Sequence, residues 1–95
     1  MAAKVFEDNE RDETIALKAL AYLAGDEEAL NQFLGLTGMA VEDLKKGAAE
    51  ASFLAGILDY FLQDEALLLA FAGASDLTPE TIVRARQRLP GALND

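Results

Sequence analysis

The chain aligns with itself when it is shifted by 38 residues, so that residues 14–49 fall on residues 52–87 without a gap. Eight of the 36 compared positions carry the same residue. The identical pairs are Leu20 and Leu58, Tyr22 and Tyr60, Asp26 and Asp64, Glu27 and Glu65, Leu30 and Leu68, Phe33 and Phe71, Gly35 and Gly73, and Glu42 and Glu80. Self-similarity at a fixed offset is typical of a repeated structural unit. The sequence therefore predicts an internal duplication, with two copies of one unit packed on each other.

Each copy is expected to contain three short helices. Alternating runs of β-branched and aromatic residues are missing, while Ala, Leu and Glu are abundant, and this composition favours helix over strand. The expected helices run from about Glu10 or Thr14 to Ala24, from Asp26 to Gly38, from Val41 to Glu50, from Ser52 to Asp64, from there to Ala74, and from Thr78 to Leu89. The predicted fold class is all-α, a compact bundle of about six short helices. Residues 11–92 would form one domain, and residues 1–10 a disordered acidic tail.

Several of these boundaries rest on side chains that cap helices. Asp26 and Asp64 can each accept hydrogen bonds from the free backbone N–H groups of a following helix. Thr78 followed by Pro79 is a strong start signal, because proline at the first helical position loses no hydrogen bond. Pro90 and the glycine after it are expected to end the last helix.

The charge balance restricts the partners of the chain. Seventeen acidic and eight basic residues give a formal net charge of −9, which disfavours nucleic acid and anionic membrane surfaces. The first 13 residues contain no apolar block like that of a secretory signal. The longest apolar tract, residues 51–74, is interrupted by acidic residues and is expected to be buried helix rather than a membrane span. The expected location is the cytoplasm.

The chain contains neither His nor Cys, and this removes most catalytic chemistry. Nucleophiles activated by histidine, thiol chemistry and disulfides are excluded for the isolated chain, and the commonest zinc ligands are missing. No glycine-rich phosphate loop is present either. We therefore expect a protein that is not an enzyme and that carries no cofactor.

One acidic group lies at the joint between two apolar helices. Asp59, Asp64 and Glu65 could form a carboxylate site for a divalent metal or a small ligand. The favoured interpretation is structural, with Asp64 as a helix cap, because Asp26 recurs at the same joint of the first copy. The following segment is apolar on every side, which indicates a central helix or one covered by a partner. Together with Leu67 and Phe71, the three acidic residues are the predicted interaction surface.

The basic residues of the last helix are the other candidate site. Arg84, Arg86 and Arg88 could bind nucleic acid or another anion. No aromatic residues are interleaved with them, and the surrounding composition is strongly acidic. A solvated face that pairs with nearby carboxylates is therefore the favoured interpretation.

The stretch from Ala51 to Phe71 resembles a small bacterial family described as domain of unknown function 3572. The resemblance extends to residues 19–24 and 33–38, and further on to residues 84–86 and 89–91. It implies an intact small helical protein, and it brings no activity, ligand or catalytic residue. The function expected from the sequence is thus a small, soluble, non-enzymatic protein-interaction module, acting on an unidentified protein partner or as a homodimer.

Overall fold

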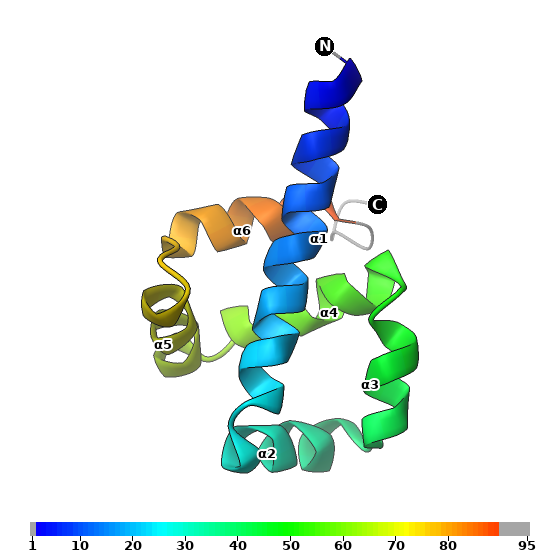
Figure 1. The fold of residues 1–95 in the computed structure, drawn as a ribbon. Coiled ribbons are helices and arrows are strands. Elements are labelled where there is room, and N and C mark those ends of the chain that lie inside the picture. Colours follow the sequence, from blue (N-terminus) through cyan, green and yellow to red (C-terminus); the bar gives the residue numbers. More distant parts are fainter. Residues whose placement is uncertain (1, 90–95) are drawn as a thin grey trace.

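The computed structural model describes the backbone of residues 2–89 and the side chains of residues 11–89. Within that part, the chain forms six α-helices and no strands (Figure 1). The helices are α1 (Ala2–Ala24), α2 (Glu27–Thr37), α3 (Val41–Gly47), α4 (Ala51–Leu62), α5 (Glu65–Ala74) and α6 (Pro79–Arg88). The all-α fold predicted from the sequence is confirmed.

The first helix is longer than predicted. It begins at Ala2, so that residues 2–10, expected as an acidic tail, lie in its N-terminal turns. Residues 2–24 contain neither Gly nor Pro, and no residue in this stretch interrupts helical hydrogen bonding. α3 is shorter than predicted and ends at Gly47, a residue with low helix propensity. The Pro90-Gly91 stop signal lies outside the described residues.

Side-chain caps begin three of the helices as predicted. The Asp26 carboxylate accepts from the backbone N–H groups of Glu28 and Ala29, at 3.1 and 3.2 Å. Asp64 accepts from Leu67 N at 3.1 Å, and Thr78 Oγ1 accepts from Thr81 N at 3.1 Å. Each bond satisfies a donor that a helix end leaves free.

The core lies where α1 crosses α4, with α6 packed against both (Figure 1). Leu23, Leu58, Phe61 and Ile82 are fully buried there. The Phe61 ring meets the ring of Phe71 edge-on, with their centroids 5.1 Å apart, and this contact fixes α5 to α4. Burial of such large side chains is the main stabilising term for a fold of this size.

The helix boundaries recur at the 38-residue offset. Equivalent ends are Ala24 of α1 and Leu62 of α4, Glu27 of α2 and Glu65 of α5, and Val41 of α3 and Pro79 of α6. The packing of the last helix of each copy differs, because α6 lies against α1, α4 and α5 whereas α3 packs extensively against no other helix. The internal duplication itself stays a prediction.

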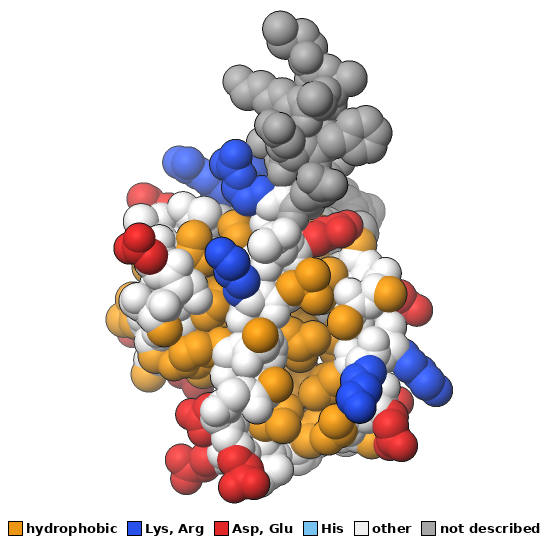
Figure 2. Space-filling view, viewed as in Figure 1, with side chains coloured by type: hydrophobic (Ala, Val, Ile, Leu, Met, Phe, Trp, Pro, Cys, Tyr) orange, Lys and Arg blue, Asp and Glu red, His pale blue; other side chains and the backbone are white. Residues whose placement is uncertain are grey.

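The loose packing of α3 leaves apolar side chains in view. Figure 2 shows them gathered between α1 and α3, on the face that no further helix covers. Leu17 of α1 and Val41 of α3 are 41% and 47% exposed.

Among the described residues, no single helix is both long and apolar enough to cross a membrane. α5 and α6 reach the length and hydropathy of a membrane span only when they are taken together, and the two helices are bent by 102° at the break between them.

Candidate functional site: an apolar groove between α2 and α4

The three acidic residues singled out in the sequence have separate roles. Asp59 on α4 accepts hydrogen bonds from Arg86, with Nε at 2.5 Å and Nη2 at 3.1 Å. Asp64 caps α5, and Glu65 is exposed in the first turn of the same helix. Within residues 11–89, no three carboxylates gather in a way that could hold a metal ion.

The two apolar residues predicted to belong to the same surface lie inward. Leu67 is half-buried, and Phe71 is fully buried, with its ring packed against those of Tyr22 and Phe61. The large apolar side chain that α5 presents to solvent is instead Leu69, which is 52% exposed. The predicted surface is therefore divided among a helix cap, an ion pair and the core.

The arginines of α6 also have different surroundings. Arg86 pairs with Asp59, and Arg88 pairs with Asp12 through Nε and Nη2, both at 2.8 Å. Arg84 is exposed on the same helix. Two of the three guanidinium groups thus bind carboxylates of this chain, as the favoured interpretation of the sequence expects. They join α6 to α4 and to α1.

Asp12, which was not among the residues predicted to be important, is completely buried. A signal for it exists in the pattern of α1. Asp12 lies on the same stripe as Ile15, Ala19 and Leu23, all of them buried and spaced by three or four residues. A carboxylate on the apolar stripe of a helix requires a cation, because an unpaired buried charge is very costly.

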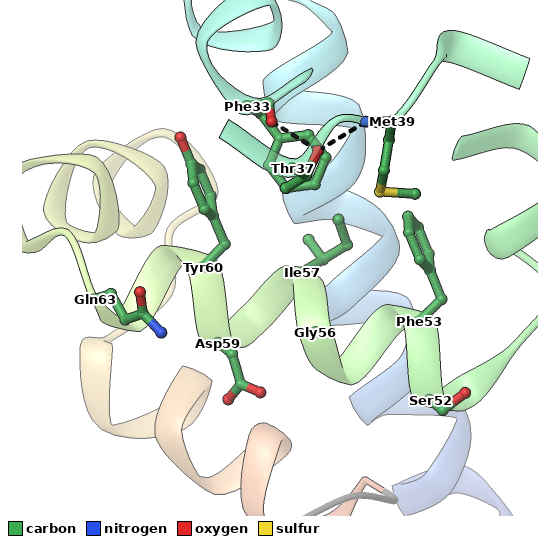
Figure 3. Close-up of a pocket in the computed structure, with 10 residues that line it drawn as sticks. All are labelled: Phe33, Thr37, Met39, Ser52, Phe53, Gly56, Ile57, Asp59, Tyr60 and Gln63. Atoms are coloured by element: carbon green, nitrogen blue, oxygen red, sulfur yellow. Dashed lines mark hydrogen bonds between the residues drawn. The ribbon is translucent and has the colours of Figure 1, made fainter. Parts of the chain in front are cut away.

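A groove of about 350 Å³ lies between α2 and α4 (Figure 3). Phe53, Ile57 and Tyr60 point into it from successive turns of α4. Phe33 and Thr37 of α2 form the opposite wall, together with Met39 just after that helix. The other lining residues are Ser52, Gly56, Asp59 and Gln63. The Asp59 side chain points away from α2, toward α6 (Figure 3).

Local hydrogen bonds hold the α2 wall in place. Thr37 Oγ1 donates to the carbonyl of Phe33 at 2.8 Å and accepts from the backbone N–H of Met39 at 3.3 Å. Gly38, between them, has φ +73°, a left-handed conformation that glycine adopts without strain and that ends α2. Phe33 is buried, and its ring meets Tyr60 edge-on with centroids 4.8 Å apart. The α2 wall of the groove is therefore held by hydrogen bonds within its own segment and by the contact of Phe33 with Tyr60.

Two glycines shape the α4 side. Gly47 ends α3 directly against the Phe53 ring, since a Cβ at this position would lie 2.5 Å from ring atoms. Only glycine allows α3 and Phe53 to approach so closely. Gly56 is exposed in the middle of α4, and a Cβ there would have no neighbour within 4 Å. The packing of the fold does not require a glycine at position 56.

The electrostatics of the groove favour neutral or positive groups. Burial raises the pKa of Tyr60 above its usual 10.0, and the nearby negative charge of Asp64 raises it further, so that the hydroxyl is protonated at neutral pH. None of the ten lining residues is a cation. Asp59 is the one lining residue with a formal charge, and Arg86 binds it.

The family of the chain follows from a comparison with protein-family models. Residues 9–92 match the model described as protein of unknown function, DUF3572. The chain belongs to the DUF3572 family. The matched span contains the groove and both ion pairs of this DUF3572 protein, so that these features lie within the family domain. No curated protein and no solved structure matches the chain.

Proposed function

We propose that this DUF3572 protein is a protein-binding module and that the groove between α2 and α4 is its binding surface. The observation that carries the proposal is the set of aromatic and Met side chains in the groove. Phe33, Phe53, Tyr60 and Met39 line it, and these residue types are enriched where proteins bind one another. The proposal includes no catalysis, in keeping with a chain that has no His or Cys.

The exposure of the groove favours a macromolecular partner over a small molecule. A typical small-molecule pocket encloses most of its ligand. Here Ser52, Gly56 and Gln63 line the groove and are exposed, so that one side of it is open to solvent. A protein segment could cover such an open apolar surface, whereas a small ligand would remain largely in water.

A partner other than a second copy fits the charge of the chain. Each protein molecule carries a formal net charge of −9, and two molecules would repel each other before any contact formed. A homodimer remains the alternative occupant of the same surface. Light scattering across a range of protein and salt concentrations separates the two, because only self-association raises the mass of the purified protein.

The test uses a substitution that fills the groove without disturbing the core. Gly56→Leu places a side chain at an exposed position of α4 where a Cβ has no neighbour. Gly73→Leu is the matched control, since Gly73 is an exposed helical glycine of α5 with the same free space, and it does not line the groove. Thermal unfolding would establish that both variants fold.

The experiment is affinity capture from the cytosolic fraction of the host, the compartment expected from the sequence, with bound proteins identified by mass spectrometry. We expect at least one protein to be retained by the wild type and by Gly73→Leu and to be lost with Gly56→Leu. If the three baits retain the same proteins, or if none retains a specific protein, the groove is not a protein-binding surface.

A further inference from the structure

We propose that the segment bound in the groove is an amphipathic α-helix with basic residues beside its apolar stripe. This inference rests on the proposed function and names the kind of partner that the same groove accepts. It is supported by the shape of the groove, by the lack of a free side-chain donor along its α2 wall, by the open position at Gly56 and by the charge around it.

The spacing of the α4 wall fits the apolar stripe of a helix. Phe53, Ile57 and Tyr60 lie at positions i, i+4 and i+7 of α4 and point into the groove (Figure 3). Ile57 is only 1% exposed and forms the floor, so that a partner would touch the half-buried rings of Phe53 and Tyr60 on either side of it. Seven residues of helix rise about 10 Å, so that this wall extends along two helical turns. Apolar side chains spaced by three or four residues on a partner helix would lie along it in the manner of other helix-in-groove complexes.

The apolar walls offer few hydrogen-bond donors to the backbone of an extended segment. The Thr37 hydroxyl donates to the Phe33 carbonyl, so that its one proton is already used. Phe33, Phe53, Ile57 and Met39 have no polar side-chain group that could donate a proton. The side chains in the groove that can donate a proton to a partner, Ser52, Tyr60 and Gln63, all lie on the α4 side. An extended segment would therefore leave carbonyl groups unsatisfied against the α2 wall, whereas a helix satisfies its own backbone.

Gly56 allows another helix to approach α4 closely. Glycine weakens the interior of a helix relative to alanine, and the packing of this fold gives no reason for it at position 56. Ser52 lies one turn earlier on α4 and is also small, exposed and part of the groove. Gly35 and Gly73 have similar free space in their helices, but neither lines the groove. The glycine within the groove is the one whose free space a bound helix would use.

The negative charge of the chain favours basic residues beside the apolar stripe of a bound helix. The chain carries a net charge of −9, and no cation lines the groove. Asp64 is exposed, and its charge is close enough to raise the pKa of Tyr60. The Asp59 side chain is 47% exposed even though it pairs with Arg86. Lys or Arg beside the apolar stripe of a bound helix would therefore meet a negative potential.

The test is a selection from two displayed peptide libraries on the immobilised full-length protein. One library is helical, with Leu, Ile, Phe or Met at the stripe positions and Lys or Glu at the flanking positions. The other has the same apolar residues in segments kept extended by proline. We expect wild type to enrich helical peptides with an excess of Lys. The best peptide should bind Gly56→Leu at least about tenfold more weakly, while Gly73→Leu binds it as wild type does.

Two further arms test the charge. Replacing Lys by Glu in the selected peptide should weaken binding by about tenfold at low salt, and the difference should shrink on the variant Asp64→Asn and at high salt. Selection of extended or Glu-flanked peptides, or of peptides that bind Gly56→Leu equally well, would overturn the inference. So would a purified protein that is dimeric through this face.

The failure of the inference can be told apart from the failure of the proposed function. If affinity capture finds a protein that depends on Gly56 while the selection returns extended or acidic peptides, the groove binds proteins but not a basic helix. If neither experiment depends on Gly56, both proposals fail together.

Discussion

Asp12 and Arg88 are separated by 76 positions in the sequence, and they form an ion pair with two hydrogen bonds of 2.8 Å. The two sides of the pair differ in their contact with water. The Asp12 side chain is 1% exposed, whereas that of Arg88 is 46% exposed. The pair therefore places a buried carboxylate of α1 against a guanidinium group at the edge of α6. The two residues should respond differently to substitution.

We expect Arg88→Met to destabilise the protein more than Asp12→Asn. Removing the arginine leaves a buried carboxylate without a cation, which costs about 3–5 kcal/mol in comparable sites. Removing the negative charge leaves a half-exposed guanidinium that water can solvate, and an amide that still accepts one hydrogen bond, so that the cost is about 1 kcal/mol. Urea unfolding of the two variants measures the difference.

Arg84→Met is the control for that prediction, because Arg84 is exposed on the same helix and its loss should change stability little. The double variant Asp12→Asn with Arg88→Met should be more stable than Arg88→Met alone, since the buried charge is gone. An Asp12→Asn variant that is less stable than Arg88→Met would contradict this account of the pair.

A second prediction concerns the contact between Gly47 and Phe53. Gly47→Ala should destabilise the protein by about 1–3 kcal/mol, because the new Cβ would overlap the ring and force it or α3 to move. Gly35→Ala, at an open helical position, should instead stabilise by up to about 1 kcal/mol. Thermal unfolding of both variants is the measurement.

The contact can be isolated by adding Phe53→Leu. In the background of Gly47→Ala, the smaller side chain should cost less than it does in the wild type, because it relieves the overlap. Additive effects of the two substitutions would mean that the Phe53 ring does not restrict position 47.

A third prediction concerns Tyr60. The pKa of Tyr60 is raised above 10.0 by burial and then by Asp64, so that this residue should ionise above pH 10 in an ultraviolet absorbance titration of the folded protein. Asp64→Asn should lower the pKa of Tyr60 only in part, because the effect of burial remains. A Tyr60 that ionises near pH 10 in the folded wild type would contradict this account of its surroundings.

The same shift makes stability depend on pH. Above pH 10 the unfolded chain releases the tyrosine proton before the folded protein does, so that the folded state binds more protons. The free energy of unfolding should therefore fall as the pH rises from 10 through the folded pKa of Tyr60. This part of the loss of stability at alkaline pH should be absent in Tyr60→Phe. Denaturant unfolding of both proteins at several pH values measures the difference.

A fourth prediction concerns the two aspartate caps. Asp26→Ala should cost about 1 kcal/mol, and Asp64→Ala somewhat less, because Asp26 accepts two backbone hydrogen bonds and Asp64 one. Millimolar Mg²⁺ or Ca²⁺ should leave the Tm of the wild type unchanged. A rise in Tm that Asp64→Asn abolishes would instead support the metal-site alternative at this joint.

Local chemistry explains what could be predicted about the fold. The starts of α2, α5 and α6 follow from Asp26, Asp64 and Thr78, whose side chains bond to backbone groups within three residues. Signals of this kind need no knowledge of the rest of the chain, and they gave the helix order and most of the boundaries.

The roles of distant residues could not be predicted in the same way. The sequence assigns Phe71 to a surface because its helix is apolar on every side, and only the packing of α5 on α4 shows which side is buried. Asp12 was missed because its partner, Arg88, comes 76 positions later. A local pattern identifies an apolar stripe, but it does not identify the cation that neutralises a carboxylate within it.

The groove also could not be predicted from a local sequence pattern. Phe53 and Ile57 are apolar residues four positions apart, a spacing that places them on one face of α4, and Ile57 is buried. Periodicity does not tell whether another helix covers that face completely. The structure leaves it partly open, because α3 is short and packs loosely beside it.

The pairing of Asp12 with Arg88 also affects the order in which the fold can form during synthesis. A ribosome makes Asp12 long before Arg88, and the carboxylate of the nascent chain has no cation from α6 during that interval. Packing that buries Asp12 before α6 is made would enclose an unneutralised charge. α6, which follows the other five helices of the described residues, thus completes the packing of α1.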